Sequence, residues 1–211
     1  MSKILISGYY GFANAGDEAM LTAIIESLRQ VEKNVELTVL SGNPEDTAAK
    51  HQVCSVYRFN PLGIIRAMKD SELIISGGGS LLQDVTSKRS LLYYLSIIGL
   101  GKFFGKKVML FAQGIGPIRA KWARKLTSLV CNEADLITVR DSESAAELIE
   151  MGVKPEKITV TADSVLSLNP VTKECGQYLL QEAGVDLTKP VIGISVRPWS
   201  GLSLIHISEP T

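Results

Sequence analysis

The amino-acid sequence predicts a doubly wound α/β fold built around a parallel β-sheet. Eight short runs rich in β-branched and other apolar residues recur along the chain, and amphipathic stretches separate most of them. Near-continuous apolar strands of this kind are typical of parallel sheets that are covered on both faces. Right-handed crossovers between such strands then place helices on both faces. A chain of 211 residues is long enough to bury a substantial core.

The individual elements follow in order from this pattern. The first strand, 3–9, reads KILISGY and reaches a turn at Gly8, so it is interpreted as a strand and not as a signal peptide. The other predicted strands are 35–41, 53–58, 72–78, 108–114, 136–141, 158–163 and 191–197. Helices are predicted over 17–30, 61–69, 90–104, 121–132 and 142–151. Asp141 or Ser142 is a suitable cap for the last of these helices.

Composition argues against several classes of protein. The chain carries 22 basic and 22 acidic residues, so we expect no nucleic-acid partner. Cys54, Cys131 and Cys175 form no CxxC pair, and the chain has only two histidines. We therefore expect neither a disulfide framework nor a zinc site, and interpret the cysteines as reduced packing residues of a cytosolic protein.

The apolar stretch 90–105 is too short and too interrupted to span a bilayer. We expect it to form a mostly buried helix. The alternative is a helix with one face against lipid or a partner.

Two glycine-rich segments follow the first and the fourth predicted strands. The first reads SGYYGFANAGDEAM, with Gly8, Gly11 and Gly16, and the second, 76–84, reads SGGGSLLQD. Both lead towards helical sequence, and in doubly wound sheets ligands bind beyond the carboxyl ends of the strands, where strand order reverses. Glycine lets backbone N–H groups approach an anion, and a helix N-terminus attracts one. We therefore predict a site for a phosphate-bearing or polyhydroxylated ligand; tight turns alone are the alternative.

Two familiar nucleotide-binding motifs are absent from these segments. The glycines do not form GxGxxG, and Gly42 and Asn43, rather than an acidic residue, follow the second strand. The chain also contains no GxxxxGK[ST], which argues against a P-loop ATPase.

Polar residues near the strand ends are candidates for ligand contact. Asp17 in the first segment is suited to act as a base or as a helix cap. Gln113 supplies an amide at the fifth strand, and Arg140, Asp141 and Asp163 end two further strands. Structural ion pairs and helix caps are the alternative roles for these charged residues.

Arg197 ends the last predicted strand and is followed by Pro198. An arginine stiffened in this way suits bidentate recognition of a carboxylate or phosphate. A surface arginine without a ligand is the alternative.

Five motifs in series resemble the polysaccharide pyruvyl transferases, in particular the bacterial CsaB type. They are GYYGFANAGDEAML, ISGGGSLLQD, AQGIGP, TVRDSES and ISVRPW, and the resemblance runs from Lys3 to about Trp199. It implies a Rossmann-like N-terminal domain over 1–199, one half of a glycosyltransferase-B-like two-domain enzyme. We expect the second α/β domain to be absent from this chain and 200–211 to be a non-native tail, such as a cloning scar.

The resemblance also implies an activity. Such an enzyme transfers an enolpyruvyl group from phosphoenolpyruvate, its donor substrate, to an N-acetylmannosamine-containing, lipid-linked cell-wall polysaccharide precursor. The product is a pyruvate ketal that anchors S-layer proteins, and the reaction is intelligible without a metal ion or cofactor. The expected location is the cytoplasm, at the inner face of the cell membrane, with peripheral membrane contact. We expect no transfer from residues 1–211 alone.

The resemblance assigns roles to particular residues. Arg197 matches the family's arginine after the last strand and is expected to meet the donor's carboxylate or phosphate; it forms the predicted catalytic pair with Asp17. The predicted substrate-binding residues are Gly8, Tyr10, Asn14, Gly16, Gly77, Gly78, Gly79, Ser80, Asp84, Gln113, Gly114, Arg140 and Asp141. A glycosyltransferase that uses a nucleotide sugar and a sugar-phosphate-binding module without activity are the alternative functions.

Overall fold

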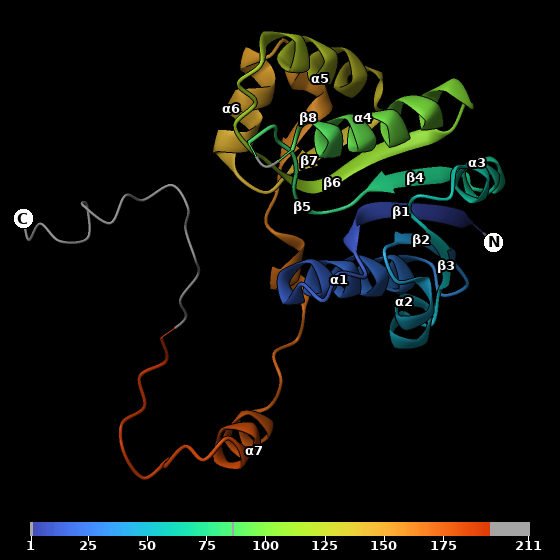
Figure 1. Ribbon diagram of the computed structural model, residues 1–211. Helices are drawn as coiled ribbons and strands as arrows, with labels where there is room; N and C mark the ends of the chain where they lie inside the picture. The colour runs from blue at the N-terminus through green and yellow to red at the C-terminus, as the bar shows by residue number, and fades with distance from the viewer. Residues whose placement is uncertain (1, 86, 195–211) are drawn as a thin grey trace, which may run out of the picture. The chain divides into compact units, whose positions relative to one another are not determined.

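The computed structural model describes residues 2–85 and 87–194 and contains one parallel sheet (Figure 1). The chain divides into two compact units, and the first, Met1–Leu168, holds every strand of the described residues. The strands are β1 (Lys3–Tyr10), β2 (Glu36–Ser41), β3 (Cys54–Tyr57), β4 (Leu73–Ser76), β5 (Gly79–Leu82), β6 (Lys107–Ile115), β7 (Leu136–Val139) and β8 (Ile158–Val160). Their order is β3-β2-β1-β4-β6-β7-β8, with β5 paired to β6. The predicted doubly wound α/β fold is confirmed.

Helices cover both faces of this sheet. The helices are α1 (Ala15–Val31), α2 (Pro44–His51), α3 (Pro61–Asp70), α4 (Lys88–Phe103), α5 (Lys121–Glu133), α6 (Ser142–Glu150) and α7 (Lys173–Glu182), with short 3₁₀ helices η1 (Pro155–Lys157) and η2 (Ser164–Ser167). Within the first unit, α1 and α2 lie on one face, and α3, α4, α5 and α6 lie on the other (Figure 1). Because β1 lies between β2 and β4, strand order reverses between β1 and β4.

The two faces bury separate groups of apolar side chains. On the α1 side, Leu21 and Ile24 pack against Ile6 and Ile75 of the sheet. A larger cluster on the opposite face joins the inward sides of α3, α4, α5 and α6 to the same strands. Burial on both faces explains the continuous apolar character of β1 and β4.

Side-chain caps begin several of the helices. Asp141 accepts a hydrogen bond from the Ser144 backbone N–H at 2.7 Å, which confirms it as the cap of α6. Helix α1 begins two residues earlier than predicted, at Ala15, and Asn14 is its cap, so the capping role considered for Asp17 is wrong. Asp17 lies instead in the first helical turn.

Helix α4 confirms the expectation of a mostly buried helix over 90–104. Its inward face includes Leu91, Tyr94 and Ile98, which are buried, while Phe103 at its end is exposed. Among the helices of the described residues, none combines the length and the apolar character that crossing a bilayer requires.

The second unit begins at Asn169 and contains α7, none of whose residues is buried. The strand predicted over 191–197 is not formed by residues 191–194, and Val191, Ile192 and Ile194 are exposed. A strand needs a neighbour to satisfy its backbone groups, and no strand of the described residues pairs with this segment. The rest of the predicted strand, with Arg197 and the 200–211 tail, lies outside the described residues.

The cysteines differ in exposure more than the sequence suggested. Cys131 is buried as expected, but Cys54 and Cys175 are exposed, so the packing role predicted for those two is wrong. Cys54 begins the edge strand β3, where one side of the backbone has no neighbouring strand to cover it.

We expect a thiol reagent at pH 8 to modify two cysteines quickly and Cys131 only slowly. Burial raises the pKa of the Cys131 thiol to about 12, so the reactive thiolate is scarce there. Counting released chromophore in the folded chain, with the urea-unfolded chain as the three-thiol control, measures this. Three equally fast thiols in the folded chain would contradict the burial of Cys131.

Candidate functional site at the carboxyl edge of the sheet

The first glycine segment is a tightly held loop between β1 and α1. The Asn14 side-chain oxygen accepts hydrogen bonds from the backbone N–H groups of Gly16 and Asp17, at 3.0 and 3.3 Å. The Glu18 carboxylate accepts one from the Gly11 N–H at 2.8 Å. Gly11 has φ +77°, and a Cβ there would lie 2.5 Å from the Asn43 backbone nitrogen. The loop therefore requires glycine at position 11 because it crosses directly over the start of α2.

The second glycine segment differs from the prediction, because it does not turn into a helix. After β4, the chain breaks at Gly77 and Gly78 and resumes as β5, which continues along β6. Gly79 has φ +96°, which returns the chain to the strand direction. Helix α4 begins only at Lys88, so the segment does not lead directly into the N-terminus of its own following helix. Only the first segment combines glycines with a helix N-terminus.

Tyr10 occupies the space between the two glycine segments. Its side chain is fully buried, at 0 % exposure, and burial raises the pKa of its hydroxyl. A Cβ on Gly8 would lie 2.3 Å from the Tyr10 ring, and a Cβ on Gly77 would lie 2.1 Å from its hydroxyl oxygen. These two glycines therefore make room for a tyrosine ring. The structure places Tyr10 beneath the candidate site rather than on its surface.

Gln113 lies inside β6 and ties the second segment to the sheet. Its Nε2 donates to Ser76 Oγ at 2.9 Å and to the Gly77 carbonyl at 2.8 Å. The adjacent Ala112 has φ +47°, and the register between β6 and β7 shifts at this point. This irregularity turns the Gln113 amide under the glycines, where it is fully buried. Gln113 supports the loop from below.

Asp17 brings the two segments together at the carboxyl edge. A Cβ on Gly79 would lie 3.3 Å from Asp17 Oδ1, so the carboxylate lies directly beside the start of β5. Partial burial raises the pKa of Asp17 above its usual range, and the neighbouring Glu18 charge adds to the effect. A carboxylate with a raised pKa is a better proton acceptor than an exposed aspartate. Gly78, next to Gly79, approaches the Met20 side chain and Ser164.

Arg140 links the start of β5 to the residues that follow β7 and β8. Its guanidinium donates to Ser80 Oγ at 3.2 Å, to Asp163 at 3.3 Å and to Asp141 at 3.4 Å. Gly114 makes room for it, since a Cβ there would lie 2.6 Å from Arg140 Nε. The carboxylates of Asp141 and Asp163 thus share one cation.

The Asp84 carboxylate forms hydrogen bonds with the protein backbone. Its two oxygens accept hydrogen bonds from the backbone N–H groups of Arg119 and Ala120, both at 2.9 Å. These bonds hold the pKa of Asp84 below its usual range. Asp84 therefore fixes the segment that leads into α5, and its role as a ligand contact stays a prediction. Arg197, the predicted donor contact, lies outside the described residues.

Sequence reasoning missed two polar residues at this edge. Ser164, at the start of η2, is buried, and its hydroxyl has no hydrogen-bond partner among the described residues. Arg58 follows β3 and reaches across to the Gly8 carbonyl, to which Nη1 donates at 3.4 Å. The signal for Arg58 was present: it ends a predicted strand between Tyr57 and Phe59, as Arg140 and Arg197 end theirs. Nothing in the sequence indicated Ser164.

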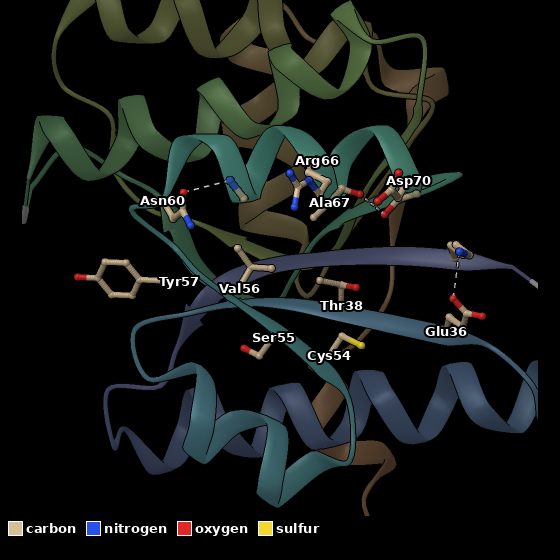
Figure 2. Close-up of a pocket in the computed structure, with 13 residues that line it drawn as sticks. Glu36, Thr38, Cys54, Ser55, Val56, Tyr57, Asn60, Arg66, Ala67 and Asp70 are labelled. Carbon is tan, nitrogen blue, oxygen red and sulfur yellow. Dashed lines mark hydrogen bonds and ion pairs between the residues drawn. The ribbon is translucent and has the colours of Figure 1, made fainter.

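A separate groove of about 490 Å³ runs between β3 and α3 (Figure 2). Figure 2 shows Thr38, Cys54 and Glu36 on its strand side and Arg66 and Asp70 on its helix side. It contains none of the predicted site residues. Its lining extends along the edge strand β3, from Lys3 and Glu36 at the amino ends of β1 and β2 to Tyr57 and Asn60, whereas ligands of doubly wound sheets bind beyond the carboxyl ends where strand order reverses. We therefore place the candidate site at the carboxyl edge. No group of metal-ligating side chains forms within the described ranges.

The replacement of Gly77 by alanine should destabilise the fold far more than the replacement of Gly78. The Gly77 methyl would lie 2.1 Å from the rigid, buried Tyr10 hydroxyl, whereas the Gly78 methyl would lie no closer than 3.1 Å to the flexible Met20 thioether and 3.5 Å from Ser164 Oγ. We expect Gly77→Ala to cost about 1–3 kcal/mol of unfolding free energy, as overpacked cores do. Urea unfolding monitored by circular dichroism measures it.

The Tyr10→Phe exchange provides the matched test. The Tyr10 hydroxyl has no hydrogen-bond partner among the described residues, so Tyr10→Phe alone should be neutral or stabilising. Combined with Gly77→Ala, it should restore much of the lost stability, because the nearest remaining ring atom is 3.2 Å away. Additive effects of the two substitutions would show that Tyr10 does not occupy this space.

Comparison with solved structures shows the class of fold. The parallel Rossmann-like fold resembles those of glycosyltransferase-B-type proteins, and the chain spans about half the length of each. Anabaena Alr3699/HepE, in complex with UDP and glucose, is 13% identical with a TM-score of 0.56, over 87% of this chain and 50% of that one. A glycosyltransferase from Rickettsia africae is 12% identical with a TM-score of 0.53, over 90% and 51%. No curated protein matches the chain in sequence.

The family itself follows from the sequence. The model of the polysaccharide pyruvyl transferase family matches residues 14–196, most of the chain. The chain belongs to the polysaccharide pyruvyl transferase family, which is a family of transferases. The match includes Asp17, the second glycine segment and Arg140, which together form the described rim.

Proposed function

We propose that this chain is the acceptor-binding half of a pyruvyl transferase of the CsaB type. The donor is phosphoenolpyruvate, and the acceptor is a lipid-linked polysaccharide precursor that contains N-acetylmannosamine. The observation that carries the proposal is the Asp17 carboxylate, half-buried beside Gly79 at the point where strand order reverses. A single rim of carboxylates, amides and hydroxyls suits the many hydroxyl groups of a sugar better than it suits a trianionic donor.

The chemistry assigns Asp17 the role of base. One acceptor hydroxyl gives its proton to Asp17 as its oxygen bonds to C2 of phosphoenolpyruvate, and the methylene carbon takes up one proton from solvent to become a methyl group. Asp17 then returns its proton to solvent. A second hydroxyl then bonds to C2, the bond from C2 to the phosphate oxygen breaks, and the second proton leaves with inorganic phosphate or solvent. The product is a cyclic pyruvate ketal.

The donor needs positive charge that the described rim supplies only in part. Arg140 is shared between Asp141 and Asp163. Arg197 therefore remains the proposed contact of the donor carboxylate or phosphate, and further cations would come from the second domain that the family resemblance implies. The protein would act in the cytoplasm at the inner membrane face, where the lipid-linked acceptor is accessible.

The test uses the protein that contains this chain together with the second domain. It is incubated with phosphoenolpyruvate and a saccharide that carries N-acetylmannosamine, and phosphate release and acceptor mass are followed. Release of one phosphate for each pyruvyl ketal gained supports the proposal. Consumption of a nucleotide sugar with no pyruvyl gain would replace it with a glycosyltransferase.

A further inference from the structure

Arg58 is a buried cation with no carboxylate partner among the described residues. Its side chain is 4 % exposed, yet it forms no ion pair there. Nη1 donates to the Gly8 carbonyl at 3.4 Å and Nη2 to the Tyr94 hydroxyl at 3.3 Å, while Nε has no partner. Burial of a charge without a counter-ion is costly, so the surroundings of Arg58 must offset the loss of water.

Aromatic rings supply that stabilisation. The guanidinium carbon lies between 4.4 and 5.8 Å from the centroids of five rings, those of Tyr9, Phe12, Phe59, Tyr93 and Tyr94. The rings come from the first glycine segment, from the residue after Arg58 and from α4. Cation–π attraction to these rings holds the arginine and, in return, fixes the rings relative to one another.

Two of these rings form an exposed stacked pair. The Tyr9 and Phe12 centroids are 4.4 Å apart with 14° between the planes, and each side chain is 41 % exposed. Phe12 also lies against Gly42, where a Cβ would approach its ring to 2.5 Å. The Gly11 N–H donates a hydrogen bond to the Glu18 carboxylate, and the Gly8 carbonyl accepts one from Arg58. These bonds hold the backbone directly before each ring of the pair.

We propose that the Tyr9–Phe12 pair is a stacking platform for a pyranose ring of the acceptor, with Arg58 as the positioning residue behind it. This inference rests on the proposed function, because it locates the sugar substrate. A pyranose presents one face of C–H groups, which packs on an aromatic ring, and an edge of hydroxyls that needs polar partners. Asn14 and Asp17 follow the platform within the same loop and first helical turn, and supply such partners.

A saccharide fits this surface better than a lipid bilayer does. Membrane-binding aromatic patches are normally surrounded by exposed basic residues that attract anionic lipids. Among the described residues, the cation in contact with these rings is Arg58, which is buried, and the charges at the start of the adjacent helix are Asp17 and Glu18. A pair of rings fixed in advance also lowers the entropy cost of binding a small rigid ligand.

Saturation-transfer NMR on the 211-residue chain tests the platform, with the methyl glycoside of N-acetylmannosamine as the probe. Irradiation of aromatic protons should transfer saturation mainly to the sugar protons of one ring face. In the Tyr9→Leu/Phe12→Leu double variant the transfer should fall at least tenfold. Phe103→Leu, which removes an exposed ring at the end of α4, is the matched control and should leave it unchanged.

The Arg58→Met variant tests whether Arg58 holds the loop that carries Tyr9 and Phe12. It keeps an unbranched, flexible side chain but removes the guanidinium and its charge, so backbone amides of 8–13 should exchange with deuterium at least tenfold faster and the saccharide signal should fall. Arg58→Lys should restore both only in part, because an ammonium cannot lie flat between rings. Wild-type exchange and binding in Arg58→Met would overturn the positioning role.

The remaining outcomes distinguish this inference from the proposed function. Wild-type saturation transfer in the double variant would overturn the platform, even if the complete protein makes the pyruvate ketal. Loss of binding to anionic vesicles in the double variant, with saccharide contact unchanged, would also overturn it, in favour of a membrane contact. Saccharide contact at Tyr9 and Phe12 without pyruvyl transfer by the complete protein would support the platform and contradict the transferase.

Discussion

Asp17→Asn should lower pyruvyl transfer by the complete protein by about 100- to 10,000-fold, the usual contribution of a general base. The amide keeps the size of the carboxylate but cannot accept the proton of an acceptor hydroxyl. Phosphate release at saturating phosphoenolpyruvate measures the loss. Glu26→Gln, an exposed acid on the same helix, is the matched control and should retain activity.

The pH dependence of the reaction provides a second readout. Burial raises the folded-state pKa of Asp17, so the acidic limb of the rate profile should lie above the usual range for aspartate. Activity should rise with pH as Asp17 loses its proton, and the Asn variant should lack this limb. A raised pKa also means that folding favours the protonated form, and that ionised Asp17 opposes folding above this pKa. Asp17→Asn should therefore unfold at an equal or higher temperature at neutral pH.

Activity and unfolding temperature together distinguish a catalytic role of Asp17 from a structural one. A variant that loses activity and also melts earlier would indicate a structural role for Asp17. Full activity in Asp17→Asn, with an unchanged acidic limb, would remove Asp17 from the mechanism altogether.

Gly11→Ala should destabilise the first unit by about 2–4 kcal/mol, through backbone strain and overpacking together. Gly11 has φ +77°, and its Cβ would meet Ser41 Oγ at 2.1 Å and the Asn43 backbone nitrogen at 2.5 Å. The backbone contact cannot be relieved by a rotamer change. The loss is measured as a lower midpoint of urea unfolding with an unchanged slope.

Gly16→Ala is the control within the same motif. Gly16 lies in the first turn of α1, and a Cβ there would meet only the Asn14 side-chain oxygen, at 3.4 Å. Alanine in a helix is favoured over glycine, so we expect a gain of up to about 1 kcal/mol. Equal losses in the two variants would show that the loop does not cross α2 as described.

The three glycines of the first segment are therefore not equivalent. Gly8 makes room for the Tyr10 ring, and Gly11 allows positive φ and close contact with the α2 loop. Gly16 donates its N–H to Asn14 but has space for a side chain. The sequence alone presented them as one anion-binding motif, since spacing does not reveal which neighbour each glycine approaches.

Local sequence patterns determined a large part of this structure. The alternation of apolar runs and amphipathic stretches predicted the doubly wound sheet, because burial on both faces dictates that pattern. The capping of α6 by Asp141 followed from residue type and position. Helix α2 was missed because its eight residues, mostly polar or small, carry no apolar stripe, although Asn43 and Pro44 are typical helix-starting residues.

Only the tertiary structure decided what surrounds the candidate site. The continuation of β4 into β5, the burial of Tyr10 under Gly77 and the approach of Arg58 to Gly8 all join segments distant in sequence. Such contacts depend on how strands are ordered and how side chains share space between them, and periodicity contains no information on either. The sequence thus determined the fold class, the family and the edge of the sheet where the candidate site is expected. Packing decided which of the candidate residues lie at the surface of that edge and which are buried beneath it.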